Sequence, residues 1–383
     1  MGKVYLSYNN IISPLGSDSV SVVDAVQQGR SGLKRINDPR LSPNPFYGAR
    51  ISSEELKDDK SIPSPSKPYT RLETLMIAAI DSVLKASNLE LTDRVGLFIA
   101  TTKGNIDVLD KAHPFSEDRA YLNTLGKVIQ HHFKFTNEAL LVSNACVSGL
   151  LAVVMAKRYI DLGVYDHVIV TGGDVLSKFV LSGFSAFQAM SHDQCKPYDL
   201  NRSGINIGEA IASLLITKDT QLLSDDAVQI LGGGSCNDAN HISGPSRTGE
   251  GLYRSVQSAM KEAKIHTEAI DYIAAHGTAT LFNDEMESVA FDRLGMNLIP
   301  LNSLKGYFGH TMGASGLVET IVGMHSLHRN TLFASLGFEA IGVSKPIHVI
   351  PETKQVPLTT FLKTSSGFGG CNTAAIFQKI KEN

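Results

Sequence analysis

The 383-residue sequence contains no tryptophan, only four cysteines and no concentrated run of lysine or arginine. Charged residues make up 19% of the chain and the formal net charge is −3. We therefore expect neither nucleic acid nor an anionic membrane surface to be its main partner. The cysteines show no CxxC pair and no Cys/His spacing typical of a metal site, which predicts reduced thiols in a cytoplasmic protein and no metal. They are Cys146, Cys195, Cys236 and Cys371.

Long apolar runs are also absent. No stretch approaches the roughly 20 residues that a membrane-spanning helix needs. The N-terminus, MGKVYLSYNNIISPLG, has neither a basic-then-apolar signal peptide nor a myristoylation pattern. Hydrophobic residues make up 43% of the chain, which is long enough for two ordinary domains or one duplicated domain. We therefore expect a cytoplasmic globular protein with no membrane partner.

Apolar strands alternate with helices along the chain, which predicts an α/β fold with mostly central strands. Val95–Thr101 reads as a buried strand, and so does His167–Thr171, which Gly172-Gly173 closes. Thr70 and Glu73 form a capping box that predicts a helix to about residue 86. The six prolines between positions 39 and 68 predict a loop outside the core.

Two segments repeat one plan: an apolar strand, a polar turn, and a helix that begins with small residues. They cover residues 140–156 (LLVSNACVSGLLAVVMA) and 299–324 (IPLNSLKGYFGHTMGASGLVETIVGM). No linker separates the two parts of the chain. We predict two related halves, residues 1–225 and residues 226–383.

Cys146 lies at the turn between the first of these strands and its helix. The unpaired N–H groups and the dipole of a helix N-terminus favour an anion there, which lowers a thiol pKa and provides a thiolate nucleophile. The alternative is a buried structural thiol, which is the commoner fate of a free cysteine.

Three other stretches carry reactive groups at strand ends or helix starts. They are AHGTATLFND with His276, NSLKGYFGHTMGASG with Lys305 and His310, and the glycine turn Gly367–Gly370. The N–H groups of such a turn are suited to face an oxyanion. A lone histidine is more often a packed core residue, so it is the order and joint occurrence of these stretches that indicate a catalytic site.

The ordered pattern resembles the β-ketoacyl-[acyl carrier protein] synthases, the elongating condensing enzymes of the thiolase superfamily. The resemblance covers almost the whole chain. Thiolases proper and the initiating synthases differ, because they use Cys-His-Cys and Cys-His-Asn sets. The matching residues are Cys146, Pro197-Tyr198-Asp199, Arg202, Gly208-Glu209, the HGTxT motif from His276 to Thr280, Lys305, Gly309-His310-Thr311, and Gly367 to Asn372, with Cys371 in place of threonine.

The resemblance implies a five-layered αβαβα thiolase sandwich made of two related halves, assembled as a homodimer. A heterodimer with a chain-length factor is the other assembly it leaves open. It also implies a decarboxylative Claisen condensation with an acyl carrier protein as partner. No metal or organic cofactor is implied, because the phosphopantetheine arrives on the carrier protein.

The resemblance also implies residue roles. Cys146 holds the acyl group, and its N–H and that of Phe368 form the oxyanion hole. His276 and His310 are neutral imidazoles that donate N–H groups to the malonyl thioester oxygen.

Further roles follow from the same resemblance. Thr278 and Thr280 bind the pantetheine arm, and Lys305 pairs with Glu287, with a structural ion pair as the alternative to a direct role. Phe368 acts as a gate, because the flanking Gly367 and Gly369 let it swing.

The chain departs from the family in several places. It opens with VYLSYNNIISPLG rather than a VVTGxG stretch, has Asn144 and Val147 near the nucleophile, and is short between Lys103 and the strand before Cys146. Because that region shapes the acyl pocket, fatty acid synthesis and a polyene or polyketide pathway both stay open.

Two other functions are compatible with such a scaffold. One is a non-catalytic partner subunit resembling a chain-length factor, although such subunits have usually lost the cysteine. The other is a simple thioesterase or acyltransferase, which would need no second histidine. Lys67 and Arg71 are candidate contacts for an acidic carrier protein, with an ordinary solvated surface as the alternative.

Overall fold

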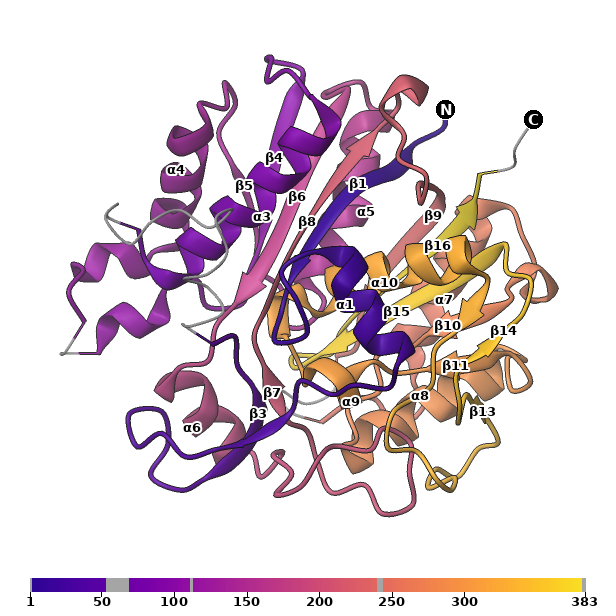
Figure 1. Cartoon of the computed structure of the whole chain (residues 1–383). Helices are drawn as coiled ribbons and strands as arrows, with labels where there is room; N and C mark the ends of the chain where they lie inside the picture. Colours follow the sequence, from indigo (N-terminus) through magenta and orange to yellow (C-terminus); the bar gives the residue numbers. More distant parts are fainter. Residues whose placement is uncertain (1, 53–68, 111–112, 240–243, 381–383) are drawn as a thin grey trace.

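The computed structural model describes residues 2–52, 69–110, 113–239 and 244–380. Within them, eleven strands form one mixed sheet in the order β13-β11-β10-β15-β16-β9-β1-β8-β6-β4-β5. Figure 1 shows the sheet running through the molecule, with the start of β1 and the end of β16 at the same side. The sheet has an N-terminal and a C-terminal part that meet at β1 and β9.

The N-terminal part contains five strands. They are β1 (Tyr5–Ile12), β4 (Val95–Ala100), β5 (Leu140–Val142), β6 (His167–Asp174) and β8 (Ala210–Thr217). β8 lies between β1 and β6 and is antiparallel to both, whereas β4 is parallel to β5 and β6. Every residue of β4 and β8 is buried, as expected for apolar strands covered on both faces.

The C-terminal part contains six strands. β1 joins it through two residue pairs with β9, Tyr5 with Gln229 and Leu6 with Val228. The predicted boundary at residue 225/226 thus falls between β8 and β9. That the two halves are separate domains stays a prediction. The strands are β9 (Val228–Asn237), β10 (Tyr272–Ala274), β11 (Pro300–Asn302), β13 (His348–Val349), β15 (Thr360–Gly367) and β16 (Cys371–Lys379).

Two buried helices, α5 (Ser148–Asp161) and α10 (Ser315–Arg329), lie between the two parts of the sheet. α3 (Arg71–Ser87) covers the other face of the N-terminal part, and α7 (Glu250–Ala263) with α8 (Leu281–Arg293) covers that of the C-terminal part. This arrangement gives the five αβαβα layers of the predicted thiolase-like sandwich. One apolar core runs through its middle and includes Val4, Leu150, Leu317 and Phe361.

The remaining elements in the described part of the chain connect and flank these layers. Four are helices: α1 (Ser19–Gln27), α4 (Leu122–Phe133), α6 (Lys178–Ala186) and α9 (Lys305–Phe308). Of these, α1 and α9 contribute buried residues to the central core. Five are short strands: β2 (Lys34–Ile36), β3 (Phe46–Ala49), β7 (Ile207–Gly208), β12 (Thr331–Leu332) and β14 (Lys354–Gln355). Short 3-10 helices span residues 106–109, 117–120, 220–222, 267–269 and 312–314.

Several local predictions can be checked directly. The capping box at Thr70 is confirmed, because its side chain accepts from Glu73 N–H and the Glu73 carboxylate accepts from Thr70 N–H. The predicted end of a strand at Gly172-Gly173 is wrong, because β6 continues to Asp174 and pairs there with β8. The loop predicted for positions 39–68 is wrong in part, because β3 lies in it with Ala49 buried. Of the described helices, none has the length and apolar character needed to cross a membrane.

Candidate active site

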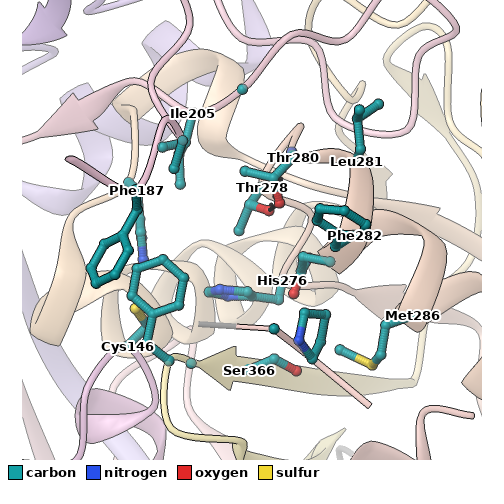
Figure 2. Close-up of a pocket in the computed structure, with 18 of the residues that line it drawn as sticks. Cys146, Phe187, Ile205, His276, Thr278, Thr280, Leu281, Phe282, Met286 and Ser366 are labelled. Carbon is teal, nitrogen blue, oxygen red and sulfur yellow. Dashed lines mark hydrogen bonds between the residues drawn. The ribbon is translucent and has the colours of Figure 1, made fainter. Parts of the chain in front are cut away.

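Cys146, His276 and His310 converge from three elements far apart in the sequence. Cys146 precedes α5, His276 follows β10, and His310 follows α9. The cysteine Sγ and one ring nitrogen of each histidine all lie within 4.8 Å of one another, and all three residues are buried. They line a cavity of about 360 Å³, and Figure 2 shows Cys146 and His276 in it. A nucleophile and two imidazoles therefore face the same small space.

The turn before α5 sets the environment of Cys146. Ala145 has a left-handed backbone (φ 46°), and α5 begins at Ser148. Burial raises the pKa of the Cys146 thiol to about 12, and the nearby Cys371 thiol acts in the same direction. The lowered thiol pKa expected from the helix N-terminus is thus wrong, because the loss of hydration outweighs it.

A glycine turn brings a backbone donor to the sulfur. The N–H of Phe368 donates a hydrogen bond to the Cys146 thiol. This approach requires glycine at position 367, because a Cβ there would lie 3.0 Å from the backbone N of Cys146. The Phe368 ring packs against Phe184 and Phe187, with centroids 5.7 and 5.2 Å apart. The turn therefore brings one N–H to the Cys146 sulfur, and the role of this N–H in an oxyanion hole stays a prediction.

Lys305 determines which nitrogen of His276 carries the proton. Its Nζ lies 3.4 Å from His276 Nδ1 and donates to the His276 carbonyl at 2.6 Å. Because an ammonium only donates, Nδ1 must accept, which leaves the proton on Nε2. Burial lowers the pKa of His276 well below its ordinary value, and Lys305 and His310 lower it further. His276 is thus a neutral imidazole that can donate from Nε2.

His310 is the second neutral imidazole. Burial lowers its pKa well below the ordinary value, and the charges of Lys305 and Lys363 add to this. Among the described residues, neither of its ring nitrogens has a hydrogen-bond partner. Its backbone N–H donates to the carbonyl of Asn206 at 2.7 Å, which fixes the chain at this point. Both ring nitrogens are therefore available to a ligand.

The predicted partner of Lys305 is wrong. Lys305 pairs with Glu319 of α10 at 2.7 Å, and Lys363 of β15 lies 2.8 Å from the same carboxylate. Burial raises the pKa of Glu319, but the two lysines outweigh it and the pKa is lowered. Sequence reasoning missed Glu319 and Lys363, although each is a lone charge in an apolar helix or strand. Such a charge must be paired when it is buried.

Glu287 holds the HGTxT turn instead. Its carboxylate accepts from the backbone N–H groups of His276 (2.9 Å) and Gly277 (2.7 Å) and from the Tyr198 hydroxyl (2.9 Å). Glu287 therefore positions the backbone of His276 and connects it to the Pro197-Tyr198-Asp199 loop.

The two HGTxT threonines lie on the wall of the cavity. Their Oγ1 atoms are 2.8 Å apart, and both residues line the pocket. Asp284 accepts from the Thr278 N–H at 2.8 Å, and burial raises the pKa of Asp284 to about 6. Thr278 and Thr280 thus present hydroxyls to a polar group in the cavity, and their role toward pantetheine stays a prediction.

Other predicted residues lie at or beyond the margin of the site. The Cys371 Sγ is 3.4 Å from the Phe368 carbonyl and 3.6 Å from the Asn144 carbonyl, so it links the glycine turn to the nucleophile turn. Arg71 pairs with Glu209 at 2.8 Å and is only a quarter exposed. Lys67 lies outside the described residues.

One donor set in the described part of the chain has the closeness that a metal site needs. It is the same group of Cys146, His276 and His310, and cysteine with two histidines is a set that Zn²⁺ accepts. The Lys305 ammonium beside His276 opposes a cation there. The absence of a metal stays a prediction.

Two family models together match most of the chain. The model described as "Beta-ketoacyl synthase, N-terminal domain" matches residues 10–221, and "Beta-ketoacyl synthase, C-terminal domain" matches residues 228–339. The chain is also similar to "3-oxoacyl-[acyl-carrier-protein] synthase 2" of Rhizobium meliloti. The two are 33% identical over 421 residues, which cover 99% of each protein.

Solved structures agree with the fold. The structure of the ketosynthase ApeO in complex with its chain length factor ApeC from Xenorhabdus doucetiae contains a chain that matches with a TM-score of 0.88 and 25% identity, over 99% of this chain and 98% of that one. A type II polyketide acyl-carrier protein in complex with its ketosynthase contains a chain that matches with a TM-score of 0.84 and 21% identity. This match covers 99% of the present chain and 100% of the other.

Proposed function

Because the chain belongs to the β-ketoacyl synthase family, we propose that it is a 3-oxoacyl-[acyl-carrier-protein] synthase, an acyltransferase that extends an acyl chain by two carbons. The observation that carries this proposal is the convergence of the Cys146 thiol with two neutral imidazoles in one buried cavity. That set supplies both a nucleophile and two donors, which a two-step condensation requires.

In the first half-reaction, the Cys146 sulfur attacks the carbonyl carbon of an acyl thioester. The thiol proton passes to the departing pantetheine sulfur, the carbon–sulfur bond to the carrier breaks, and a new one to Cys146 forms. Negative charge develops on the carbonyl oxygen, and the N–H of Phe368 is positioned to stabilise it. The carrier leaves as a free thiol.

In the second half-reaction, malonyl carrier protein loses CO2, and the electron pair of the broken carbon–carbon bond forms an enolate. N–H groups of His276 and His310 stabilise the enolate oxygen, and His276 does so from Nε2. The enolate carbon attacks the acyl-Cys146 carbonyl and expels the Cys146 thiolate, which takes up a proton from water. No proton has to be taken from malonate.

We propose acyl- and malonyl-loaded carrier proteins as partners and a homodimer as the assembly. The solved relatives with a chain length factor or a carrier protein support such partners, and a heterodimer is the alternative. We propose a cytoplasmic location, which the four free cysteines support. The pathway, fatty acid or polyene and polyketide synthesis, stays open. A non-catalytic chain-length-factor role is not favoured, because Cys146 and both histidines are present.

Intact mass of the protein after exposure to a panel of acyl carrier proteins tests the nucleophile. We expect a gain equal to the acyl group in the wild type and none in Cys146→Ala. Addition of malonyl carrier protein should then discharge the acyl group, release CO2 and give a 3-oxoacyl product.

A protein that is never acylated would contradict the active synthase and favour the partner-subunit role. Acylation followed by hydrolysis without condensation would indicate a thioesterase or acyltransferase. We propose that no metal or organic cofactor takes part, so prior EDTA treatment should leave the condensation rate unchanged.

A further inference from the structure

A buried carboxylate that the proposed mechanism does not use lies against the loop that follows His310. Asp174 is the last residue of β6 and is 1% exposed. Burial raises the pKa of the Asp174 carboxyl, and hydrogen bonds from neighbouring N–H and O–H groups oppose that rise. A carboxylate that has lost its water must be compensated by such donors, so the elements that supply them indicate what Asp174 holds in place.

The turn after β4 supplies donors from the N-terminal half. The Thr101 hydroxyl donates to Asp174 Oδ1 at 2.9 Å. The backbone N–H of Thr102 lies 3.0 Å from Oδ2, and that of Lys103 lies 3.2 Å from Oδ1. Because β4 and β6 are paired along the sheet, these bonds fix the carboxylate to the framework of the N-terminal half.

A further donor comes from the C-terminal half. The N–H of Gly313 donates to Asp174 Oδ2 at 2.8 Å. A Cβ on Gly313 would lie 2.7 Å from the same oxygen and 2.8 Å from the Thr101 Cα, so the loop lies directly against Asp174 and the end of β4. The preceding residue, Met312, has a left-handed backbone (φ 52°), which a side chain adopts only where its surroundings hold it there.

His310 depends on this backbone because no hydrogen bond holds its ring within the described part of the chain. On its N-terminal side, its N–H donates to the Asn206 carbonyl at 2.7 Å and its carbonyl accepts from the Gly208 N–H at 3.0 Å. On its C-terminal side, the Gly313 N–H on the buried carboxylate anchors the loop three residues later. The direction of the imidazole is therefore set by anchors on both sides of it.

We propose that Asp174 is a positioning residue for the second half-reaction, which holds the loop after His310 so that the imidazole donates to the enolate oxygen. This inference rests on the proposed function, which gives His310 that task. Asp174 is not among the residues that line the described cavity, so it acts through His310 and exchanges no proton with the substrate. Acylation of Cys146 should not depend on it.

The test measures the two half-reactions separately in Asp174→Asn, which keeps the side-chain shape but replaces one acceptor oxygen by a donor amide. Mass gain of Cys146 follows acylation, and CO2 release from malonyl carrier protein by the acylated enzyme follows the second step. We expect CO2 release to slow about a hundredfold, the usual cost of a misplacement of about 1 Å. The acylation rate should stay close to that of the wild type.

A double-mutant cycle with His310→Ala tests whether Asp174 acts through the imidazole. A residue that acts only through His310 has no further effect once the ring is gone. The double variant Asp174→Asn/His310→Ala should therefore release CO2 at the same rate as His310→Ala alone. A residue that merely supports the fold would instead lower this rate further.

Asp271→Asn is the matched control. The Asp271 carboxylate also fixes a turn, because it accepts from the Thr359 N–H (2.6 Å) and hydroxyl (2.8 Å) and from the Thr360 N–H (2.8 Å). It lies at the opposite end of β10 from His276. Asp271→Asn should leave the rates of both half-reactions unchanged.

A second variant approaches the same contact from the loop. Gly313→Ala places a methyl group against the carboxylate and should slow CO2 release more than acylation. This variant decides the question if Asp174→Asn does not fold. Equal slowing of both half-reactions, or additive losses in the cycle, would overturn the proposal and leave Asp174 a purely structural role. A wild-type protein that takes up no acyl group would instead overturn the proposed function, and the role of Asp174 with it.

Discussion

At the scale of single residues, the site depends on keeping its groups uncharged until a substrate arrives. Burial raises the pKa of the Cys146 thiol and lowers those of His276 and His310. The resting site therefore holds a thiol and two neutral imidazoles. The charges appear only on the substrate, next to donors that are already in place.

The raised thiol pKa predicts how Cys146 reacts with iodoacetamide. Only the thiolate is alkylated, and with a pKa of about 12 its fraction rises about tenfold for each pH unit between pH 7 and pH 9. Alkylation followed by mass spectrometry should show this slope without a plateau. A cysteine peptide, with a pKa of about 8.5, is the control and should level off above pH 9. A plateau for Cys146 between pH 6 and pH 8 would contradict the prediction.

The buried charges at Glu319 predict a loss of stability. Glu319→Gln leaves two buried lysines, Lys305 and Lys363, without their carboxylate. Leaving a buried charge without its partner costs about 3–5 kcal/mol in the free energy of unfolding. Urea unfolding measures this loss. Glu90→Gln, at an exposed position, is the control and should stay within about 0.5 kcal/mol of the wild type. Equal stability of the two variants would mean that Glu319 does not compensate the lysines.

At the scale of elements, the two buried helices touch at their first turns. A Cβ on Gly149 of α5 would lie 2.7 Å from the Gly313 carbonyl, and one on Gly316 of α10 would lie 2.8 Å from the Leu150 backbone N. Because α5 begins next to Cys146, this contact sets how closely the nucleophile approaches the elements that carry the histidines.

Alanine at these glycines should separate the helices. Gly149→Ala and Gly316→Ala should each lower the free energy of unfolding by about 1–3 kcal/mol through overpacking, and should slow acylation of Cys146. Gly183→Ala is the matched control, since Gly183 lies in α6 with open space at its Cβ. It should instead stabilise the protein by about 0.5–1 kcal/mol. Thermal unfolding and acylation rates measure both effects, and a gain of stability in all three variants would refute the close contact.

Local signals predicted most elements from the sequence. The capping box at Thr70 and the apolar run of β4 define their elements without help from the fold. The end of β6 was not predictable, because pairing with β8 overrides the glycines that would otherwise stop a strand. α6 was missed because its sequence, KFVLSGFSA, has serine and glycine where a helix usually has strong formers.

The candidate site was predictable in part, because its residues lie in short motifs that are recognisable without knowledge of the fold. The structure brings Cys146, His276 and His310 of these motifs together. The pairing of Lys305 depends instead on how α10 crosses the site. Glu287 and Glu319 both follow a motif histidine, and only the packing of the helices decides which carboxylate reaches the lysine.

At the scale of the whole molecule, the two halves share one sheet and one core. β1 pairs with β8 of its own half and with β9 of the other. The core cluster joins residues on both sides, such as Leu150 and Phe361. Each half alone would expose an apolar face and an unpaired strand edge.

We therefore expect the halves to fold only together. Calorimetry of the full chain should show one transition, and residues 1–225 expressed alone should be digested rapidly by protease and lack a cooperative transition. Mixing with residues 226–383 should restore both properties. A folded, protease-resistant 1–225 fragment would show that the halves are independent domains.

The position of the last strand has a consequence for synthesis. β16, the last strand that the structure describes, lies in the middle of the C-terminal part of the sheet, between β9 and β15 (Figure 1). The facing edges of β9 and β15 therefore stay unpaired in the nascent chain until β16 has been made. β16 pairs with β15 as far as Gly367, so a chain cut before Cys371 lacks both this central strand and the pairing that holds the glycine turn against Cys146. We expect copies cut there to be inactive and open to proteolysis, because the pocket around the nucleophile is incomplete.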